Sequence, residues 1–301
     1  MTKTLKILVV SQKGGVGKST LSTNFAAWCG EKKNLSTTVL DFDPHASSST
    51  WIKELSPKNV SHKEASSSDF SAQRWYMGAR TIIRKVDSTC DIAIADVTWT
   101  KGMNADFLTE FNLVIVPTSV SQLDIDATHD FIVKNINSFK EKITNLSNSK
   151  LTPALMLLPS MVTDEQLKTN PFTSKNFDFP FLLLPPIPFD KNVRLLFKKK
   201  FIHQSEIATK NLFEICFEAI TQAGKIHIKE HNLKINRRLT PQKIQNMRGD
   251  LPPTNEKSKK IWSTKRKIQE SENIAKIVNS QLNNNNRAVR KRSWLEKITS
   301  W

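Results

Sequence analysis

The sequence predicts an α/β fold in which helices flank a mainly parallel β-sheet. Short apolar runs alternate with longer helical patterns along the first 224 residues, as they do in sheets built from strand–helix–strand units. The first apolar run, residues 5–10, leads into a glycine-rich loop and then into a helical pattern. With 301 residues, of which 38% are hydrophobic, the chain can bury a substantial core.

The apolar runs place the expected strands in order along the chain. They lie at residues 5–10, 37–41, 91–95, 112–116, 153–158 and 181–184. Helical patterns predict helices at residues 18–29, 124–139 and 205–223. Because glycine commonly ends a helix, we expect the first helix to stop at Gly30 and the third to stop at Gly224.

The composition changes after residue 224. Residues 225–301 contain 19 Lys and Arg against 6 Asp and Glu, so they carry +13 of the net charge of +17. Asparagine, lysine and arginine dominate this segment, and such a composition cannot supply a second core. We therefore expect a folded domain over residues 1–224 and a basic, partly disordered or helical extension over residues 225–301.

The cysteines and the hydropathy exclude several classes of protein. Cys29, Cys90 and Cys216 lie far apart without a C-x-x-C spacing, so neither a disulfide framework nor a zinc or iron–sulfur site is indicated. Nowhere do 18 apolar residues follow one another, as a membrane-spanning helix would need. A reduced, cytoplasmic location is expected.

Residues 11–20 read SQKGGVGKST and have the character of a phosphate-binding loop. Gly14, Gly15 and Gly17 let backbone N–H groups approach phosphate oxygens, and the start of the following helix adds its positive dipole end. Lys18 would reach the β- and γ-phosphates, and the Ser19 hydroxyl would bind Mg²⁺. The stretch therefore predicts a P-loop, Rossmann-like nucleotide fold, although the first glycine of the general P-loop pattern is missing.

A second lysine makes this loop resemble that of one family. The loop is similar to the deviant Walker A loop of the ParA/MinD ATPases, which position DNA, division sites and other cargo in bacteria. The resemblance covers about residues 5–224, so residues 1–224 would form the ATPase domain. It implies an ATP-bound homodimer in which Lys13 acts catalytically on the partner's phosphates. The ATP-binding residues that it implies are Lys13, Gly14, Gly15, Val16, Gly17, Lys18, Ser19 and Thr20.

Three acidic residues match further motifs of the family. Asp41 and Asp43 resemble its D-x-D-P segment, which implies that Asp43 orients or deprotonates the attacking water and that Asp41 supports the metal shell. Asp96 closes a buried run like the family's Walker B acid and would hold a Mg²⁺-bound water. The two prolines that commonly follow are absent, so the shape of residues 97–104, the switch segment, stays open.

Two later segments also resemble the family. Asp124 lies in an L-D segment after the switch, and the resemblance gives it a dimer or switch role, with a helix N-cap as the alternative. Residues 186–195 resemble the region near the adenine and the DNA-facing edge. Candidate DNA contacts in and directly after this region are Arg194, Lys198, Lys199 and Lys200. A solvated helix face is the other interpretation of the lysine run.

Absent features exclude other relatives with such a loop. Iron–sulfur ATPases and arsenite-pump ATPases need paired thiols, and the related tyrosine kinases carry a tyrosine cluster, whereas this chain has one tyrosine. We therefore expect a partition or positioning ATPase with weak intrinsic activity, stimulated by a ParB-like or cargo-adaptor protein. The basic extension favours nonspecific DNA as its matrix and a nucleoid-associated location.

Three alternatives remain for the role of the chain. Arg290, Lys291 and Arg292 are candidate DNA contacts, but the Trp-bearing residues 294–301 that follow them are also typical of an interfacial membrane anchor like that of MinD. The extension could instead be a docking arm for a protein partner. The order of motifs also resembles family members that act as accessory ATPases in conjugative DNA transfer.

Overall fold

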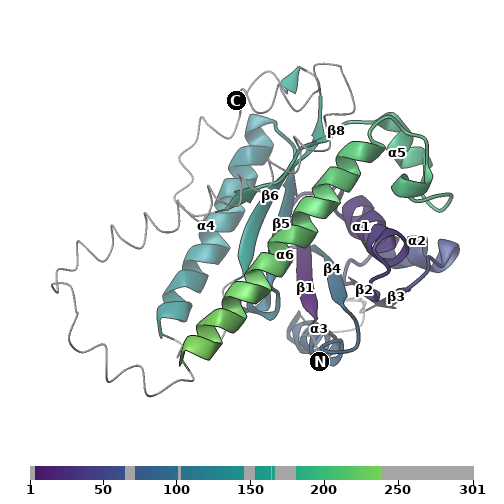
Figure 1. Ribbon diagram of the computed structural model, residues 1–301. Coiled ribbons are helices and arrows are strands. Elements are labelled where there is room, and N and C mark those ends of the chain that lie inside the picture. Colours follow the sequence, from purple (N-terminus) through teal and green to yellow (C-terminus); the bar gives the residue numbers. More distant parts are fainter. Residues whose placement is uncertain are drawn as a thin grey trace.

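The computed structural model describes residues 4–64, 72–100, 103–145, 153–163, 165–166 and 181–238. Within these residues, eight strands form one parallel sheet in the order β3-β2-β4-β1-β5-β6-β7, and β8 pairs with β6. Helices cover both faces of the sheet (Figure 1). The predicted α/β fold with a mainly parallel sheet is confirmed.

All six expected strands are present. The described strands are β1 (Leu5–Ser11), β2 (Thr37–Asp41), β3 (Val60–Glu64), β4 (Ile92–Thr98), β5 (Leu113–Thr118), β6 (Ala154–Val162), β7 (Leu182–Leu183) and β8 (Ile187–Pro188). The sequence did not predict β3 or β8. β3 forms the edge of the sheet and reads VSHKE, so it lacks the apolar run by which a buried strand is detected. β8 has only two residues.

The three expected helices are also present, with others between them. The described helices are α1 (Lys18–Lys32), α2 (Ser47–Leu55), α3 (Ala72–Lys85), α4 (Gln122–Asn145), α5 (Lys191–Leu195) and α6 (Lys210–Arg238), with 3₁₀ helices η1 (Ala105–Glu110) and η3 (Ile202–Gln204). The sequence missed α2, α3 and α5. α2 begins with three serines, which favour caps and turns in the absence of tertiary contacts. Within the described ranges, every helix is too short or too polar to span a lipid bilayer.

The predicted helix ends at Gly30 and Gly224 are wrong. α1 continues to Lys32 and α6 continues to Arg238. A Cβ atom at Gly30 would lie 2.4 Å from the carbonyl oxygen of Lys58, and one at Gly224 would lie 2.4 Å from Leu5 Cδ2. Both glycines therefore let a helix approach a neighbouring segment closely, a role that sequence cannot distinguish from a helix cap.

The core has one layer on each face of the sheet. Along β1, Ile7 and Val9 face the layer that contains α1, α2 and α6, whereas Leu8 and Val10 face the layer that contains α3, α4 and η1. Both faces of the central strands are thus buried. This burial explains why these strands read as almost continuous apolar runs rather than alternating ones.

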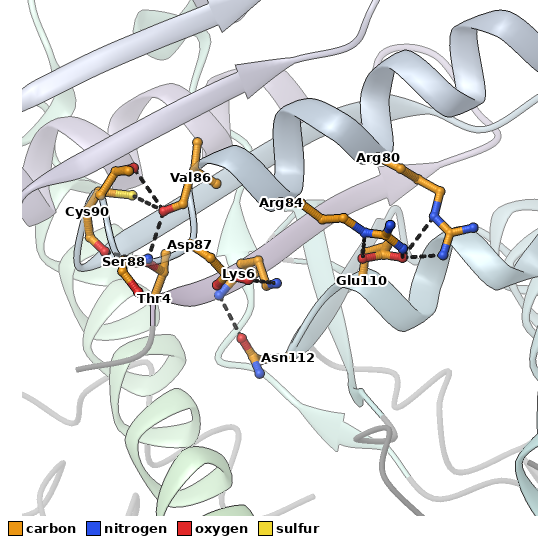
Figure 2. Close-up of polar contacts among 11 residues, drawn as sticks. Thr4, Lys6, Arg80, Arg84, Val86, Asp87, Ser88, Cys90, Glu110 and Asn112 are labelled. Atoms are coloured by element: carbon orange, nitrogen blue, oxygen red, sulfur yellow. Dashed lines mark hydrogen bonds and ion pairs between the residues drawn. The ribbon is translucent and has the colours of Figure 1, made fainter. Parts of the chain in front are cut away.

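Polar contacts fix the amino end of β1 (Figure 2). The Thr4 hydroxyl donates to the carbonyl oxygen of Cys90 at 2.7 Å, and the backbone N–H of Lys6 donates to Asn112 Oδ1 at 2.8 Å. The Lys6 ammonium, almost fully buried, pairs with Asp87 Oδ2 at 3.0 Å. Because the glycine loop follows the other end of β1, these contacts fix the strand that carries the loop without taking part in the loop itself.

Two glycine substitutions should have opposite effects on stability. Gly30→Ala should lower the free energy of unfolding by about 1–3 kcal/mol, because the new methyl group would overlap a backbone carbonyl that cannot move freely. Gly78→Ala, in α3 with no atom within 4 Å of the new Cβ, should raise it by about 0.5–1 kcal/mol through helix propensity. Urea unfolding of both variants checks this prediction. Similar stabilities for the two variants would contradict it.

Candidate phosphate and carboxylate site

The loop between β1 and α1 has the geometry of an anion cradle. Gly15 and Gly17 have φ angles of +79° and +86°, in the left-handed region that favours glycine. Gly17 also caps the amino end of α1. No atom lies within 4 Å of a Cβ built at Gly14 or Gly15, so an anion can approach the backbone there. The N–H groups that begin α1 are therefore available to phosphate oxygens.

Lys18 is buried inside this loop. Its residue is 7% exposed, and its ammonium donates to the carbonyl oxygen of Lys13 at 3.3 Å. The side chain therefore folds back over the loop rather than extending into solvent. An anion held by the loop would form charge-assisted hydrogen bonds with this ammonium.

Two carboxylates lie side by side at the same edge of the sheet. Asp41 ends β2 and is paired in register with Asp96 of β4, and both residues are almost fully buried. The first turn of α2 holds them: Ser49 N–H donates to Asp41 at 2.7 Å, and the Ser48 hydroxyl donates to Asp96 Oδ2 at 2.5 Å. The other oxygen of Asp96, Oδ1, is buried without a hydrogen-bond partner.

Burial dominates the electrostatics of this pair. It raises the pKa of Asp96 to about 6, against hydrogen bonds from Ser48 and Ser19 that lower it. Burial also raises the pKa of Asp41. A nearby cation would stabilise both carboxylates in their charged form, and the unpartnered oxygen of Asp96 is a vacant acceptor for one.

The residues at this site fit a magnesium ion that is shared with a phosphate. Among the described residues, no group of three or more His, Cys, Asp or Glu side chains could hold a metal ion by itself. Mg²⁺, however, usually binds one or two carboxylates together with waters and substrate phosphates. Asp96, the neighbouring Ser19 and an anion in the glycine loop would supply such a set.

Asp43 lies just beyond the end of β2 and is half buried. Its Oδ1 accepts a hydrogen bond from the backbone N–H of His45 at 3.0 Å, and its Oδ2 accepts one from the Thr98 hydroxyl. Thr98 ends β4 and is paired in register with Ser11 at the start of the glycine loop. The carboxylate thus lies between the ends of β2 and β4, and β4 is the strand next to β1, which leads into the loop.

The second lysine of the loop points elsewhere. The Lys13 ammonium forms an ion pair with Asp124 Oδ1, and the Lys13 side chain remains 40% exposed. Asp124 also accepts hydrogen bonds from the Ser119 and Ser121 hydroxyls. Asp124 lies in the first turn of α4, which begins at Gln122, so the alternative role of helix N-cap is wrong for it. The Ser121 hydroxyl accepts from the Asp124 N–H instead.

A pocket opens beside the loop, between α1, β6, β8 and α5. The Ser160 hydroxyl bridges its two sides by donating to the Val16 carbonyl oxygen at 2.9 Å. The region that the sequence placed near the adenine thus lies next to the phosphate loop. The pocket is lined by Gly15, Gly17, Thr20, Leu21, Leu158, Ser160, Met161, Ile187, Pro188, Phe189, Asp190, Val193, Arg194 and Phe213.

The candidate DNA-binding residues divide into two groups. Arg194 is exposed on α5, and Lys198, Lys199 and Lys200 are exposed in the turn that follows α5 rather than along a helix face. Arg290, Lys291 and Arg292 lie outside the described residues.

Sequence reasoning missed the hydroxyl groups that hold the acidic residues. Ser48, Thr98, Ser119 and Ser121 each donate to a predicted site carboxylate. Residues 47–49 carried the clearest signal, because three serines follow the D-x-D-P segment closely. Pairing a particular hydroxyl with a particular acid needs the distances between strand ends.

Comparison with known proteins identifies the family. The family model described as the CobQ/CobB/MinD/ParA nucleotide binding domain (CbiA) matches residues 7–300. The chain belongs to this family. The resemblance to ParA/MinD ATPases, inferred from the loop and the three acids, is thereby confirmed. A search of the curated proteins finds no matching relative.

Solved structures of this family share the fold. Apo McdA of Cyanothece superposes with a TM-score of 0.55 at 11% sequence identity, over 71% of this chain and 98% of that chain. A chain of the MinC:MinD cell division protein complex of Aquifex aeolicus superposes with a TM-score of 0.54 at 11% identity, over 72% of this chain and 96% of that chain. Cobyrinic acid a,c-diamide synthase of Mycobacterium smegmatis, bound to ADP and magnesium, superposes with a TM-score of 0.50 at 15% identity. The match covers 73% of this chain and 96% of that chain. At these identities the comparison concerns the fold alone.

Replacing Asp96 should stabilise the nucleotide-free protein at neutral pH. The native pKa of about 6 lies above the reference value of 3.8, so the native state binds more protons than the unfolded chain between these values. Wild-type stability should therefore fall as the pH rises from about 4 to about 6, and it should stay lower above that range. Asp96→Asn cannot ionise and should be more stable by roughly 2 kcal/mol at pH 7.5.

Urea unfolding across this pH range, in the presence of a chelator, measures the effect. Asp130→Asn, which changes an exposed acid of α4, is the matched control and should follow the wild type. If Asp96→Asn shows the same pH dependence as the wild type, burial does not raise the pKa of the Asp96 carboxyl group in the wild-type protein.

Proposed function

We propose that this protein is an ATPase that dimerises when it binds ATP and positions DNA or other cargo. The placement of the two loop lysines carries the proposal. Lys18 is buried within its own loop, whereas Lys13 reaches Asp124 in the first turn of α4 and stays 40% exposed. Lys18 alone would serve a nucleotide bound in the same chain, so Lys13 would be free to serve another. The presence of this second lysine in the loop supports a nucleotide shared between two copies of the chain.

ATP and Mg²⁺ would bind at the glycine loop and the paired carboxylates. Backbone N–H groups of residues 14–20 would hold the phosphates, with Lys18 between the β- and γ-phosphates. Ser19 and Asp96 would hold the magnesium ion, directly or through water, and Asp41 would support that shell. When bound, the ion neutralises charge that develops on the transferred phosphoryl group. The pocket beside the loop has a position and an apolar lining that suit the adenine base of ATP.

Hydrolysis would depend on Asp43, which would orient or deprotonate the attacking water. In a single chain its carboxylate is already occupied by the Thr98 hydroxyl and the His45 N–H. Separating the Asp43 carboxylate from Thr98 requires a shift of the switch segment, residues 97–104, which includes the end of β4. We propose that this requirement keeps intrinsic turnover slow and that a ParB-like or cargo-adaptor protein accelerates hydrolysis by moving the segment.

Dimerisation would require Lys13 to leave Asp124. The ammonium would exchange one carboxylate for the phosphates of the partner's ATP, which carry more negative charge. Asp124 would keep the Ser119 and Ser121 hydroxyls as donors, so the exchange would not leave it without partners. The ion pair thus holds the second lysine near the loop until a partner presents its nucleotide.

The surface on which the dimer acts would be nonspecific DNA. Residues 225–301 carry a net charge of +13, and polycations bind the phosphate backbone in a salt-sensitive manner. Two extensions on one dimer would bind with higher avidity than one. Residues 239–301, on which the membrane-anchor and docking-arm alternatives depend, lie outside the described residues.

Three single substitutions should separate nucleotide binding, dimerisation and hydrolysis. Lys18→Ala should weaken ATP binding roughly 10- to 100-fold, because a charge-assisted hydrogen bond contributes about 1.5–3 kcal/mol. Lys13→Ala should still bind ATP but should no longer form ATP-dependent dimers. Asp43→Ala should form stable ATP-bound dimers without turnover. Calorimetry, sedimentation and phosphate release measure the three properties.

Lys33→Ala, at the far end of α1 and paired with Glu218, is the control and should match the wild type in all three measurements. Unchanged ATP-dependent dimerisation of Lys13→Ala would refute the role of this lysine in the partner's site. Normal turnover of Asp43→Ala would assign the catalytic carboxylate elsewhere.

Shortening the chain should weaken DNA binding steeply. A protein that ends at Arg238 keeps all of α6 and loses 14 Lys and Arg against 5 Asp and Glu. With a non-hydrolysable ATP analogue bound, its affinity for duplex DNA should be lower, and it should change less with salt, because fewer counterions are released. Equal affinity and equal salt dependence would show that the extension does not bind DNA.

A further inference from the structure

One surface segment combines exposed apolar side chains with a cluster of cations. Among the described residues, six large hydrophobic side chains are exposed, and three of them fall within residues 189–200, here called the α5 segment. Phe189 is 50% exposed, Leu195 is 63% exposed and Phe197 is 41% exposed. Such clustering within twelve residues differs from the scattered apolar residues of an ordinary surface.

The same segment carries a strong positive charge. Its one acid, Asp190, accepts hydrogen bonds from the backbone N–H of Asn192 at 2.8 Å and from the Thr209 hydroxyl at 3.0 Å. That carboxylate therefore caps α5 rather than neutralising the lysines. The exposed cations of the segment are Lys191, Arg194, Lys198, Lys199 and Lys200.

The packing of α5 turns these side chains outward. Val193 and Leu196, three positions apart and so on one face, contact the core. Leu195, between them in sequence, is left outside. Phe197 contacts Trp51 edge to face, with ring centroids 5.2 Å apart, and the Lys198 ammonium lies 5.4 Å from the Phe197 ring. The segment is thus anchored to the body of the protein and lies at its periphery, in the upper right of Figure 1.

We propose that the α5 segment docks on an anionic lipid surface. Leu195, Phe197 and Phe189 would enter the headgroup region, and the surrounding lysines would contact lipid phosphates. Interfacial protein segments combine Lys and Arg with Phe and Leu in this way, and each basic residue near an anionic leaflet strengthens binding about fivefold.

Two other partners fit the segment less well. Protein–DNA interfaces are polar, so a duplex would leave the apolar surface of Leu195 in water. Protein–protein interfaces are depleted in lysine, whereas three consecutive lysines follow Phe197 here. On this proposal, four of the candidate DNA contacts would contact lipid phosphates instead of DNA: Arg194, Lys198, Lys199 and Lys200.

Docking would be coupled to the nucleotide site. Phe189, Val193 and Arg194 of the α5 segment also line the pocket beside the glycine loop. Phe197 contacts Trp51 of α2, the helix whose first turn holds the carboxylates of Asp41 and Asp96. Because both ligands share these elements, a nucleotide that favours docking must itself bind more tightly on the membrane, by the same factor.

A fluorescent label at position 195 tests the proposal directly. The natural cysteines are all buried, and burial raises the pKa of the Cys29 and Cys216 thiols, so Leu195→Cys in the full chain can be labelled selectively with an environment-sensitive dye. Vesicles of phosphatidylcholine with phosphatidylserine should shift its emission to the blue. Vesicles of phosphatidylcholine alone and duplex DNA should not. Met77→Cys, at a position that is 61% exposed on α3, is the matched control and should not respond.

An unlabelled pair of variants gives an independent measurement. Leu195→Gln in the full chain should lower the affinity for phosphatidylserine vesicles about five- to tenfold, through the loss of apolar burial. Met77→Gln should leave that affinity unchanged. The proposal fails if phosphatidylserine vesicles do not shift the emission of the label at position 195. That result is expected if only the basic extension binds the vesicles. It also fails if the label responds equally at position 77 or to DNA, or if Leu195→Gln binds like the wild type.

Discussion

The burial of two carboxylates near the carboxyl ends of β2 and β4 is the constraint on which the candidate site depends. Asp41 and Asp96 are neighbours on parallel strands, and burying charge without compensation is costly. The structure compensates with donors from the first turn of α2 and with the nearby Lys18. One acceptor, Asp96 Oδ1, remains without a partner. A magnesium ion and a triphosphate would complete this arrangement, so the same constraint that requires α2 also prepares the site for its ligand.

The glycine loop places its two lysines in opposite surroundings. Lys18 follows directly after the left-handed Gly17 and is drawn into the loop at the start of α1. Lys13 precedes the glycines, and its ammonium reaches the first turn of α4. Five positions along the chain thus separate a buried lysine from one that forms a partly exposed ion pair. This division allows one loop to serve its own nucleotide and, as proposed, that of a second copy.

The α5 segment connects this site to a second surface. Its inner side lines the pocket beside the loop, and Phe197 contacts the helix that holds the carboxylates. Its outer side presents leucine, phenylalanine and lysine to solvent. A change in the nucleotide site can therefore reach this surface through direct packing, without a conformational change in the sheet itself.

The sequence by itself determined the family of the protein and the middle of its fold. Strands buried on both faces appear as apolar runs, as at Leu113–Thr118. The glycine loop and the acids after β2 and within β4 appear at fixed spacings. Only the tertiary structure decided how α2 and β3 form, why Gly30 and Gly224 lie inside helices, and which hydroxyl holds which acid. The reason is physical: local patterns report burial and backbone preference, whereas a contact such as Ser48 with Asp96 or Lys13 with Asp124 joins residues 48 and 111 positions apart. Such contacts exist only once the strand ends have met.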